Sequence, residues 1–143
     1  MTSPTESRPS LARLVWTPVG LLVSWILLMW VIELVDTVAL DDRLQRHGLR
    51  PREVEGLDGI MWAPFLHTDF GHLASNTVPF LALGGLVAVR GIRYWAWITA
   101  ITIVIGGGAT WLLGGSGLHV GASGVVFGYF GAILGAAAVS YTH

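Results

Sequence analysis

Four long apolar stretches alternate with shorter polar segments along the chain. The first, residues 14–32, contains no charged residue, and its apolar character extends toward residue 40. Three more stretches follow at residues 73–89, 94–113 and 123–141. A helix needs about 20 mostly apolar residues to cross a bilayer, whereas the apolar core of a signal peptide has roughly 7 to 15. The pattern therefore predicts four transmembrane helices, and the first is not a signal peptide that is cleaved off.

The segments between these stretches differ in character. Residues 41–66 form a polar connection that ends in an aromatic and apolar group at 62–66, which is typical of a segment resting in the membrane interface. A short arginine-bearing turn at 90–93 joins the second and third stretches, and a glycine-rich loop at 114–121 joins the third and fourth. We expect a half-submerged loop after the first helix, and a short cytoplasmic tail at residues 1–13.

The composition is that of a membrane protein and limits the kinds of site and partner to be expected. The chain is 53% hydrophobic and 12% charged, against about 25% charged residues in soluble domains. It contains no cysteine, which excludes disulfides and thiolate metal sites within these residues. The net charge of −1 gives no electrostatic reason to expect a nucleic-acid partner.

The arginines predict an orientation. Arg8 and Arg13 precede the first helix, Arg90 and Arg93 lie between the second and third, and the loop 114–121 has no basic residue. Basic residues favour the cytoplasmic side. We therefore expect an integral, multi-pass protein, in a bacterial plasma membrane, with a cytoplasmic N-terminus. The loop 41–66 would then lie outside, although it carries four arginines.

Two polar motifs converge in this topology. His67, His72 and Asn76 lie at the outer entrance of the second helix, and Gly121-Ala122-Ser123-Gly124 opens the fourth. The spacing of His72 and Asn76 places them on one helix face. Ser123 is flanked by glycine at a helix start, where free backbone amides favour an oxyanion. A hydroxyl nucleophile facing hydrogen-bond donors is the arrangement that acyl transfer requires.

These two motifs together resemble those of the rhomboid intramembrane serine proteases, and the resemblance extends from about residue 56 through 135. It implies an all-α membrane protein, here the first four helices of a six-helix bundle. It also implies Ser123 as the nucleophile and His72 and Asn76 as oxyanion-stabilising groups. Residues expected to support the site are His67, Gly121 and Gly124. The substrates would be transmembrane segments of other proteins, and no metal or organic cofactor is implied.

One part of the family pattern lies outside this sequence. Rhomboids take their histidine base from the sixth helix, so we expect an incomplete transmembrane domain, residues 14–143, that is inactive on its own. His143 would lie about 30 Å along the fourth helix from Ser123, too far for proton transfer. His119, four residues before Ser123, could approach it, but the sequence shows no partner that would orient its ring.

Two other functions stay open at this point. One is a non-catalytic rhomboid-like protein that binds membrane proteins, and the other is a small four-helix transporter. The transporter would need an ionisable group within a span, and Glu33 is the candidate, although we expect Glu33 and Asp36 to be interfacial. We also expect an interfacial location for four tryptophans, Trp16, Trp30, Trp95 and Trp111.

The fourth helix carries a stripe of small residues. Gly124, Gly128, Gly131 and Gly135 recur at helical spacing, and such stripes allow the close approach of another helix in a membrane. In the family the neighbour of this helix carries the histidine base. We therefore expect the stripe to receive that later helix and to face away from the first three.

Overall fold

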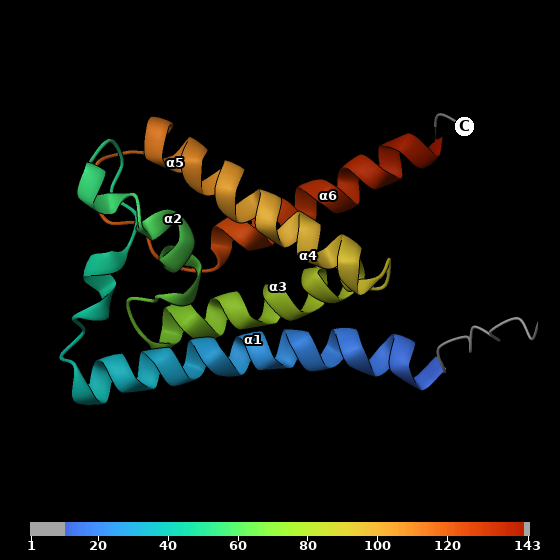
Figure 1. Ribbon diagram of the computed structural model, residues 1–143, viewed down its shortest axis with the longest axis horizontal. Coiled ribbons are helices and arrows are strands. Elements are labelled where there is room, and N and C mark those ends of the chain that lie inside the picture. The colour runs from blue at the N-terminus through green and yellow to red at the C-terminus, as the bar shows by residue number, and fades with distance from the viewer. Residues whose placement is uncertain (1–10, 142–143) are drawn as a thin grey trace, which may run out of the picture.

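Four long helices dominate the structure, a computed structural model that describes residues 11–141, with side chains from 18 to 140 (Figure 1). Each contains a segment that is long and apolar enough to cross a membrane: Pro18–Ala39, Phe70–Ala88, Ile92–Leu113 and Ser123–Ser140. The prediction of an all-α protein with four spanning helices is confirmed. Of the expected tail, residues 1–10 lie outside the described part.

The first, second and fourth spans are single helices. They are α1 (Leu11–Ala39), α3 (Phe70–Ala88) and α6 (Ser123–Tyr141). The second span begins three residues earlier than the apolar pattern predicted, because Asp69 accepts a hydrogen bond from the backbone N–H of His72 and caps the helix at Phe70.

The third span is interrupted. It consists of α4 (Ile92–Ile101), a π-helical turn η4 (Thr102–Gly106) and α5 (Gly107–Leu113). The wider turn separates two α-helical segments within one continuous span, and such π-turns occur frequently at functional sites.

The connection between α1 and α3 folds into four short elements. These are η1 (Leu44–His47), η2 (Val54–Gly56), α2 (Gly59–Trp62) and η3 (Ala63–Phe65). Its last part reaches deep into the bundle, because the ring of Phe65 stacks on Trp25 with ring centroids 4.7 Å apart. Trp25 lies about 20 Å along α1 from its end at Ala39. The loop is therefore half-submerged relative to the spanning helices, as predicted.

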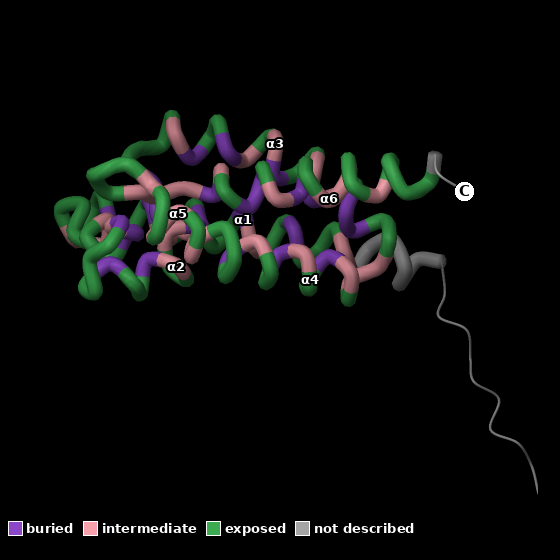
Figure 2. The backbone as a smooth tube through the Cα atoms, turned by 90° about the horizontal axis from the view of Figure 1, so that it is seen from above, coloured by how far each residue is buried: buried purple, intermediate pink, exposed green. Residues whose placement is uncertain are grey.

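Helix α3 lies between α1 and α6 and contacts both. The three helices approach most closely at Gly84, where a Cβ atom would lie 2.9 Å from Leu22 and 3.1 Å from Tyr129. A buried hydrogen bond of 2.8 Å between the hydroxyls of Thr99 and Tyr129 joins α4 to α6. Buried residues line the inner faces of the bundle, and much of its outer surface is exposed (Figure 2). Large apolar side chains occupy that surface, as expected of helices surrounded by lipid.

Both polar motifs lie at the same end of the bundle. The C-termini of α1 and α5 and the N-termini of α3 and α6 point to this end, while the turn before α4 lies at the other (Figure 1). Helix α6 begins well inside the ends of α1 and α5. Its first residue, Ser123, is therefore recessed into the bundle, a depth that the sequence pattern did not predict.

Some polar and aromatic residues that were predicted to be interfacial are buried inside the bundle. Glu33 and Asp36 are each only 2% exposed, and a carboxylate oxygen of Asp36 accepts a hydrogen bond from the backbone N–H of Leu44. Trp95 is buried in the core and meets Trp25 edge to face. The side chain of Trp16 lies outside the described part of the structure.

Candidate active site

The entrance of α3 is held by hydrogen bonds within the first motif. One carboxylate oxygen of Asp69 accepts from the backbone N–H of His72 at 2.8 Å, and the other accepts from the hydroxyl of Thr68 at 3.0 Å. The His72 amide, followed by the Thr68 hydroxyl, lowers the pKa of Asp69. An ionised carboxylate at a helix N-terminus is also favoured by the helix dipole. Asp69 therefore fixes the turn that carries His72.

His67 fills the space beneath this turn. Its side chain is fully buried, and its ring meets the ring of His72 edge to face with centroids 5.2 Å apart. Neither ring nitrogen has a hydrogen-bond partner within the described residues. Burial, followed by the proximity of His72, lowers the pKa of His67 to about 4. At neutral pH His67 is an uncharged packing group, which suits the supporting role that we predicted for it.

The two motifs meet at Gly121. This residue has φ +111°, and a Cβ atom on it would lie 2.8 Å from the His72 imidazole and 3.2 Å from the side-chain nitrogen of Asn76. Its backbone N–H donates to the carbonyl of Ala63 at 2.8 Å, which ties it to the submerged loop. Both the backbone conformation and the lack of space favour glycine here. The structure thus brings together three of the predicted site residues: His72, Asn76 and Gly121.

Asn76 and His72 offer hydrogen-bonding capacity next to this contact. Asn76 is 6% exposed, and its side-chain NH₂ has no hydrogen-bond partner in the described part of the chain. Buried donors of this kind are rare in folded proteins and call for a functional explanation. The Nδ1 of His72 lies 3.2 Å from the Thr68 hydroxyl. Because the Thr68 hydroxyl donates its one proton to Asp69, Nδ1 of His72 donates to the Thr68 oxygen, and Nε2 of the neutral ring is an acceptor; Nε2 becomes a donor when the Thr68 hydroxyl turns from Asp69 to Nδ1.

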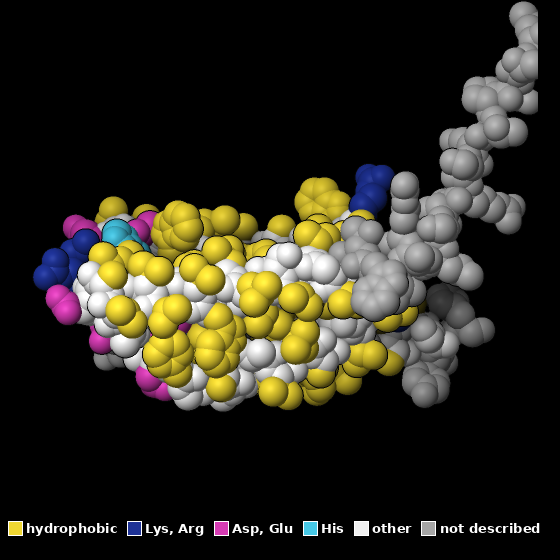
Figure 3. Space-filling view, turned by 90° about the horizontal axis from the view of Figure 1, so that it is seen from below, with side chains coloured by type: hydrophobic (Ala, Val, Ile, Leu, Met, Phe, Trp, Pro, Cys, Tyr) yellow, Lys and Arg dark blue, Asp and Glu magenta, His cyan; other side chains and the backbone are white. Residues whose placement is uncertain are grey.

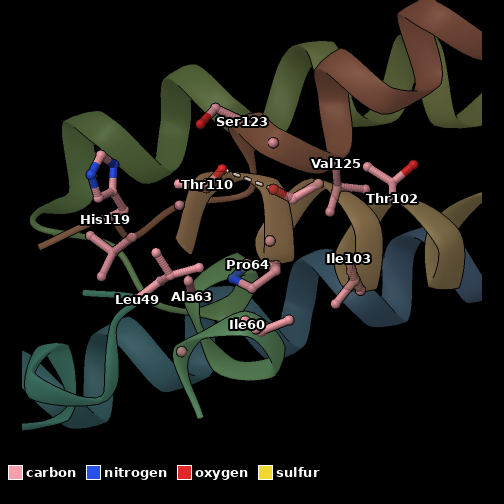
Figure 4. Close-up of a pocket in the computed structure, with 16 residues that line it drawn as sticks. Leu49, Ile60, Ala63, Pro64, Thr102, Ile103, Thr110, His119, Ser123 and Val125 are labelled. Carbon is pink, nitrogen blue, oxygen red and sulfur yellow. Dashed lines mark hydrogen bonds between the residues drawn. The ribbon is translucent and has the colours of Figure 1, made fainter. Parts of the chain in front are cut away.

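Ser123 borders a cavity of about 340 Å³ (Figure 4). The submerged loop supplies Ile60, Ala63 and Pro64 to its wall, and the third span supplies residues from Thr102 to Thr110. Gly121, Gly124 and His119 also line it, whereas His72 and Asn76 do not and lie behind Gly121. The Ser123 side chain is half-buried, and its hydroxyl forms no hydrogen bond with the described residues. It is therefore free to meet a ligand in the cavity.

The loop before Ser123 is held by the submerged loop, a feature that sequence reasoning missed. Leu49 and His119 exchange two backbone hydrogen bonds of 2.8 and 2.9 Å. The guanidinium of Arg52 donates to the carbonyls of Leu112 at 3.3 Å and Gly114 at 2.9 Å, where α5 ends. A single arginine in a polar loop carries no sequence signal for such a contact. These hydrogen bonds fix the path of the chain from α5 to the start of α6.

His119 has an orienting partner that the sequence did not show. Its Nε2 lies 3.1 Å from the carbonyl oxygen of Gly115. Because a carbonyl only accepts, Nε2 carries the proton and Nδ1 of the neutral ring is left as an acceptor. No hydrogen bond joins His119 to Ser123 within the described residues. His143, the other histidine considered as a base, lies outside the described residues.

The four glycines of the α6 stripe differ in their surroundings. A Cβ atom on Gly124, Gly131 or Gly135 would meet no atom within 4 Å. Gly128 departs from the expectation that the stripe faces away from the first three helices, because a Cβ there would collide with Thr102 of η4. This glycine packs α6 against the third span, and the other three border open space.

These features define the class of protein: a multi-pass helical membrane protein with a recessed polar site at one end of the bundle. Comparison with known proteins identifies the family, because the family model described as Rhomboid domain matches residues 56–142. The chain belongs to the rhomboid family.

Relatives of the chain extend the comparison along nearly its whole length. It is 36% identical over 140 residues to uncharacterized proteins of Mycobacterium bovis and Mycobacterium tuberculosis, covering 93% of this chain and 56% of each relative. It is 36% identical over 129 residues to an uncharacterized protein of Mycobacterium leprae, covering 85% of this chain and 51% of that relative. The chain thus spans about half the length of these curated relatives. No solved structure matches.

Proposed function

We propose that this chain forms the nucleophile-bearing part of an intramembrane serine protease that cleaves transmembrane segments of membrane proteins. Membership of the rhomboid family supports this activity. The observation that carries the proposal is the contact of Gly121 with His72 and Asn76, two residues before Ser123. It places hydrogen-bond donors of one helix against the chain that leads into the helix with the serine.

In this mechanism the Ser123 hydroxyl attacks the carbonyl carbon of a peptide bond, and the carbonyl oxygen becomes an oxyanion. The side-chain NH₂ of Asn76 donates to that oxygen, and His72 donates from Nε2 once the Thr68 hydroxyl turns from Asp69 to Nδ1. The backbone N–H of Ser123 adds a third donor, because the first amides of a helix have no partner within the helix. Donors that are already in position stabilise the developing charge without reorganising.

The hydroxyl proton must pass to a base. The base then gives this proton to the amine nitrogen as the carbon–nitrogen bond breaks, and a water molecule hydrolyses the acyl-enzyme and frees the Ser123 hydroxyl. Within the family this base comes from the sixth helix, and we propose the same for the complete protein, because the chain covers only about half of its relatives. His119 is the second candidate, since it lines the cavity with Ser123 and offers Nδ1 as an acceptor. We further propose a bacterial plasma membrane location with the N-terminus in the cytoplasm, based on the arginines of the 90–93 turn.

The complete protein, assayed with a transmembrane reporter in membrane vesicles, provides the test. Ser123→Ala removes the nucleophile, and we expect loss of reporter cleavage. Ser140→Ala is the matched control, since Ser140 lies on the same helix at its other end and its exposed hydroxyl bonds only to the carbonyl of Ala136. Cleavage at the normal rate by the Ser123→Ala protein would contradict the proposal.

A transporter remains the alternative that one observation favours. Glu33 is buried within a spanning helix, and one of its carboxylate oxygens lacks a hydrogen-bond partner within the described residues. Buried ionisable groups in a membrane frequently mark ion or proton paths. The transporter reading predicts the reverse pattern of effects: Glu33→Gln would abolish function and Ser123→Ala would leave it intact.

A further inference from the structure

A second cavity lies between the outer half of α1 and the submerged loop. Its volume is about 340 Å³, and it is separate from the cavity beside Ser123. We refer to it as the loop groove. The residues that line it are Ile32, Leu44, His47, Trp62, Phe65 and Leu66. All of them are apolar except His47, so the interior suits a hydrocarbon chain and offers almost nothing to a polar ligand.

The groove extends from the end of the bundle into its apolar part. Ile32 lies about 10 Å along α1 from Ala39. Phe65 lines the groove and is anchored by its stack on Trp25 at 4.7 Å. Trp62 is 54% exposed and its neighbour Met61 is 55% exposed, so this part of the loop faces outward beside the groove. In a protein that spans a bilayer, the groove therefore lies at the depth of lipid acyl chains.

Two arginines, Arg43 and Arg46, lie in and next to the short element η1, which supplies Leu44 and His47 to the groove. In the 3₁₀ turn η1, residues three apart share a face. Leu44 and His47 take the groove face, and Arg43 and Arg46 share the adjacent one. Arg46 is exposed and forms no ion pair or side-chain hydrogen bond with the described residues, and Arg43 has only an exposed contact of 3.7 Å with Asp41. Two guanidinium groups are thus available beside an apolar groove.

The mouth is fixed in place. The backbone N–H of Leu44 donates to the buried carboxylate of Asp36 at 2.8 Å. His47 lies 3.0 Å from a carboxylate oxygen of Asp58. This contact occupies the Asp58 carboxylate and holds η1 against the start of α2. Acidic, basic and histidine side chains gather at the end of the molecule that carries the loop, a further basic group stands near the other end, and apolar side chains cover the length between them (Figure 3). The arrangement matches a phospholipid, whose phosphate lies at the membrane surface and whose acyl chains run inward.

We propose that the loop groove binds one anionic phospholipid of the adjacent leaflet. An acyl chain fills the space between Ile32 and Phe65, and Arg43 and Arg46 contact the phosphate and the anionic headgroup. Guanidinium groups are well suited to phosphate recognition. The bound lipid would hold the submerged loop against α1. The proposal does not depend on the protease activity, because no residue of the groove belongs to the candidate active site.

The test uses the full 143-residue chain, reconstituted in bilayer nanodiscs that contain phosphatidylglycerol and phosphatidylcholine, and native mass spectrometry after release. The wild-type chain should retain one phospholipid, with phosphatidylglycerol preferred. Leu44→Trp places a larger side chain in the groove and should lower this occupancy at least fivefold. Val78→Trp is the matched control, because Val78 is 70% exposed on α3 and lines neither the loop groove nor the cavity beside Ser123; its occupancy should equal that of the wild type.

The headgroup contact is tested separately. Arg46→Gln should reduce the preference for phosphatidylglycerol over phosphatidylcholine about fivefold, since one basic residue near an anionic lipid surface contributes roughly that factor. Arg93→Gln, at the other end of the bundle, should leave it unchanged. Equal lipid retention by Leu44→Trp and Val78→Trp would overturn the groove as the site. An unchanged preference in Arg46→Gln would overturn the choice of an anionic lipid, and a bound polypeptide in place of phospholipid would overturn both.

A second measurement covers the case in which Leu44→Trp does not fold. Phosphatidylglycerol with brominated acyl chains quenches tryptophan fluorescence on contact. At lipid ratios where the annular lipids are still unbrominated, part of the wild-type fluorescence should already be quenched, and this quenched component should be absent in Trp62→Phe because Trp62 lines the groove. Quenching of Trp62 that rises only in proportion to total brominated lipid would show ordinary annular contact and would contradict a bound lipid.

Discussion

The two helices that carry the polar groups of the site, α3 and α6, are held in different ways. Helix α3 is capped by Asp69 and packed between α1 and α6, with Asn76 and Phe80 buried. Helix α6 begins two residues after the constrained Gly121, and the flank that carries Gly131 and Gly135 borders open space. Both helices have 19 residues and start at the same end of the bundle.

The difference corresponds to the two parts of the site: α3 carries the hydrogen-bond donors and α6 carries the serine. Hydrogen-bond donors that stabilise a transition state must be positioned in advance, and α3 provides such positions because it is enclosed by its neighbours. The helix with the serine is fixed in its first half, by the hydrogen bonds of the loop before it, by the contact of Gly128 with Thr102 and by the buried Tyr129, which bonds to Thr99. We propose that later helices of the complete protein pack on its open flank.

Substitution at Gly121 is the most severe way to disturb the contact between α3 and the start of α6. In the complete protein, Gly121→Ala would drive a methyl group into His72 and Asn76 at once. Since the loss of one oxyanion donor costs about 10² to 10³ in rate, we expect kcat/KM for a transmembrane reporter to fall at least about 10³-fold. Steady-state cleavage assays in proteoliposomes measure this.

Gly117→Ala is the matched control for that experiment. Gly117 has φ +127°, close to the +111° of Gly121, but a Cβ there would meet no atom within 4 Å. Gly117→Ala introduces the same kind of backbone strain as Gly121→Ala, about 1–3 kcal/mol, but its methyl group collides with no neighbour. We expect activity within a fewfold of the wild type. Equal losses in the two variants would show that strain in the loop, and not contact with α3, explains the effect of Gly121→Ala.

Asn76 tests the role of α3 with a smaller change. Asn76→Asp keeps the size of the side chain and replaces its buried NH₂ donor by an acceptor. We expect kcat of the complete protein to fall about 10² to 10³-fold, or about 2.7–4 kcal/mol, with KM little changed, because the donor acts on the transition state. Thr77→Val, one residue away and bonded to Trp30 of α1 at 3.1 Å, should change stability more than kcat. A raised KM with normal kcat in Asn76→Asp would assign Asn76 to substrate binding instead.

The spans and the family were predictable from sequence because both depend on local patterns. An apolar stretch long enough to cross a bilayer is visible without knowledge of its neighbours, and the two motifs are short and ordered. The faces of the helices were not predictable. Helix α1 is apolar on every side, so no periodic signal shows which side is buried. The burial of Glu33 and Asp36 within the bundle was missed for this reason.

The candidate site was predictable only in its residues and not in its shape. The positions of the motifs indicated that both lie at one end of the bundle. The close contact of Gly121 with His72 and Asn76 depends on how the loop before α6 is held. Arg52, which contributes to that restraint, bonds to carbonyls about sixty positions away in the chain. Contacts over such separations leave no pattern in a single sequence.

The two sides of α6 can be compared directly through its glycines. In the 143-residue chain, Gly128→Ala should lower the free energy of unfolding by about 1–3 kcal/mol, because the added methyl group overpacks the contact with Thr102. Gly131→Ala should not destabilise, and the better helix propensity of alanine would add up to about 1 kcal/mol. Thermal unfolding in detergent micelles measures both. Equal destabilisation by the two substitutions would show that the flank with Gly131 is covered within this chain.

The smallest effect concerns the group beneath the entrance of α3. Burial lowers the pKa of His67 to about 4, below the usual value near 6.5. Between these two values the unfolded chain binds a proton at this residue and the folded chain does not, so the stabilising contribution is complete above pH 6.5 and is lost as the pH falls toward 4. The slope should approach about 1.4 kcal/mol per pH unit within that window. The unfolding of the wild type and of His67→Gln can be followed by circular dichroism from pH 7.5 to 4.5. The difference between their free energies of unfolding isolates the contribution of His67, because the other titrating groups are the same in both proteins. We expect the stability of the wild type to fall more steeply with acid than that of His67→Gln, and parallel pH profiles would show that His67 is hydrated or protonated within the folded protein.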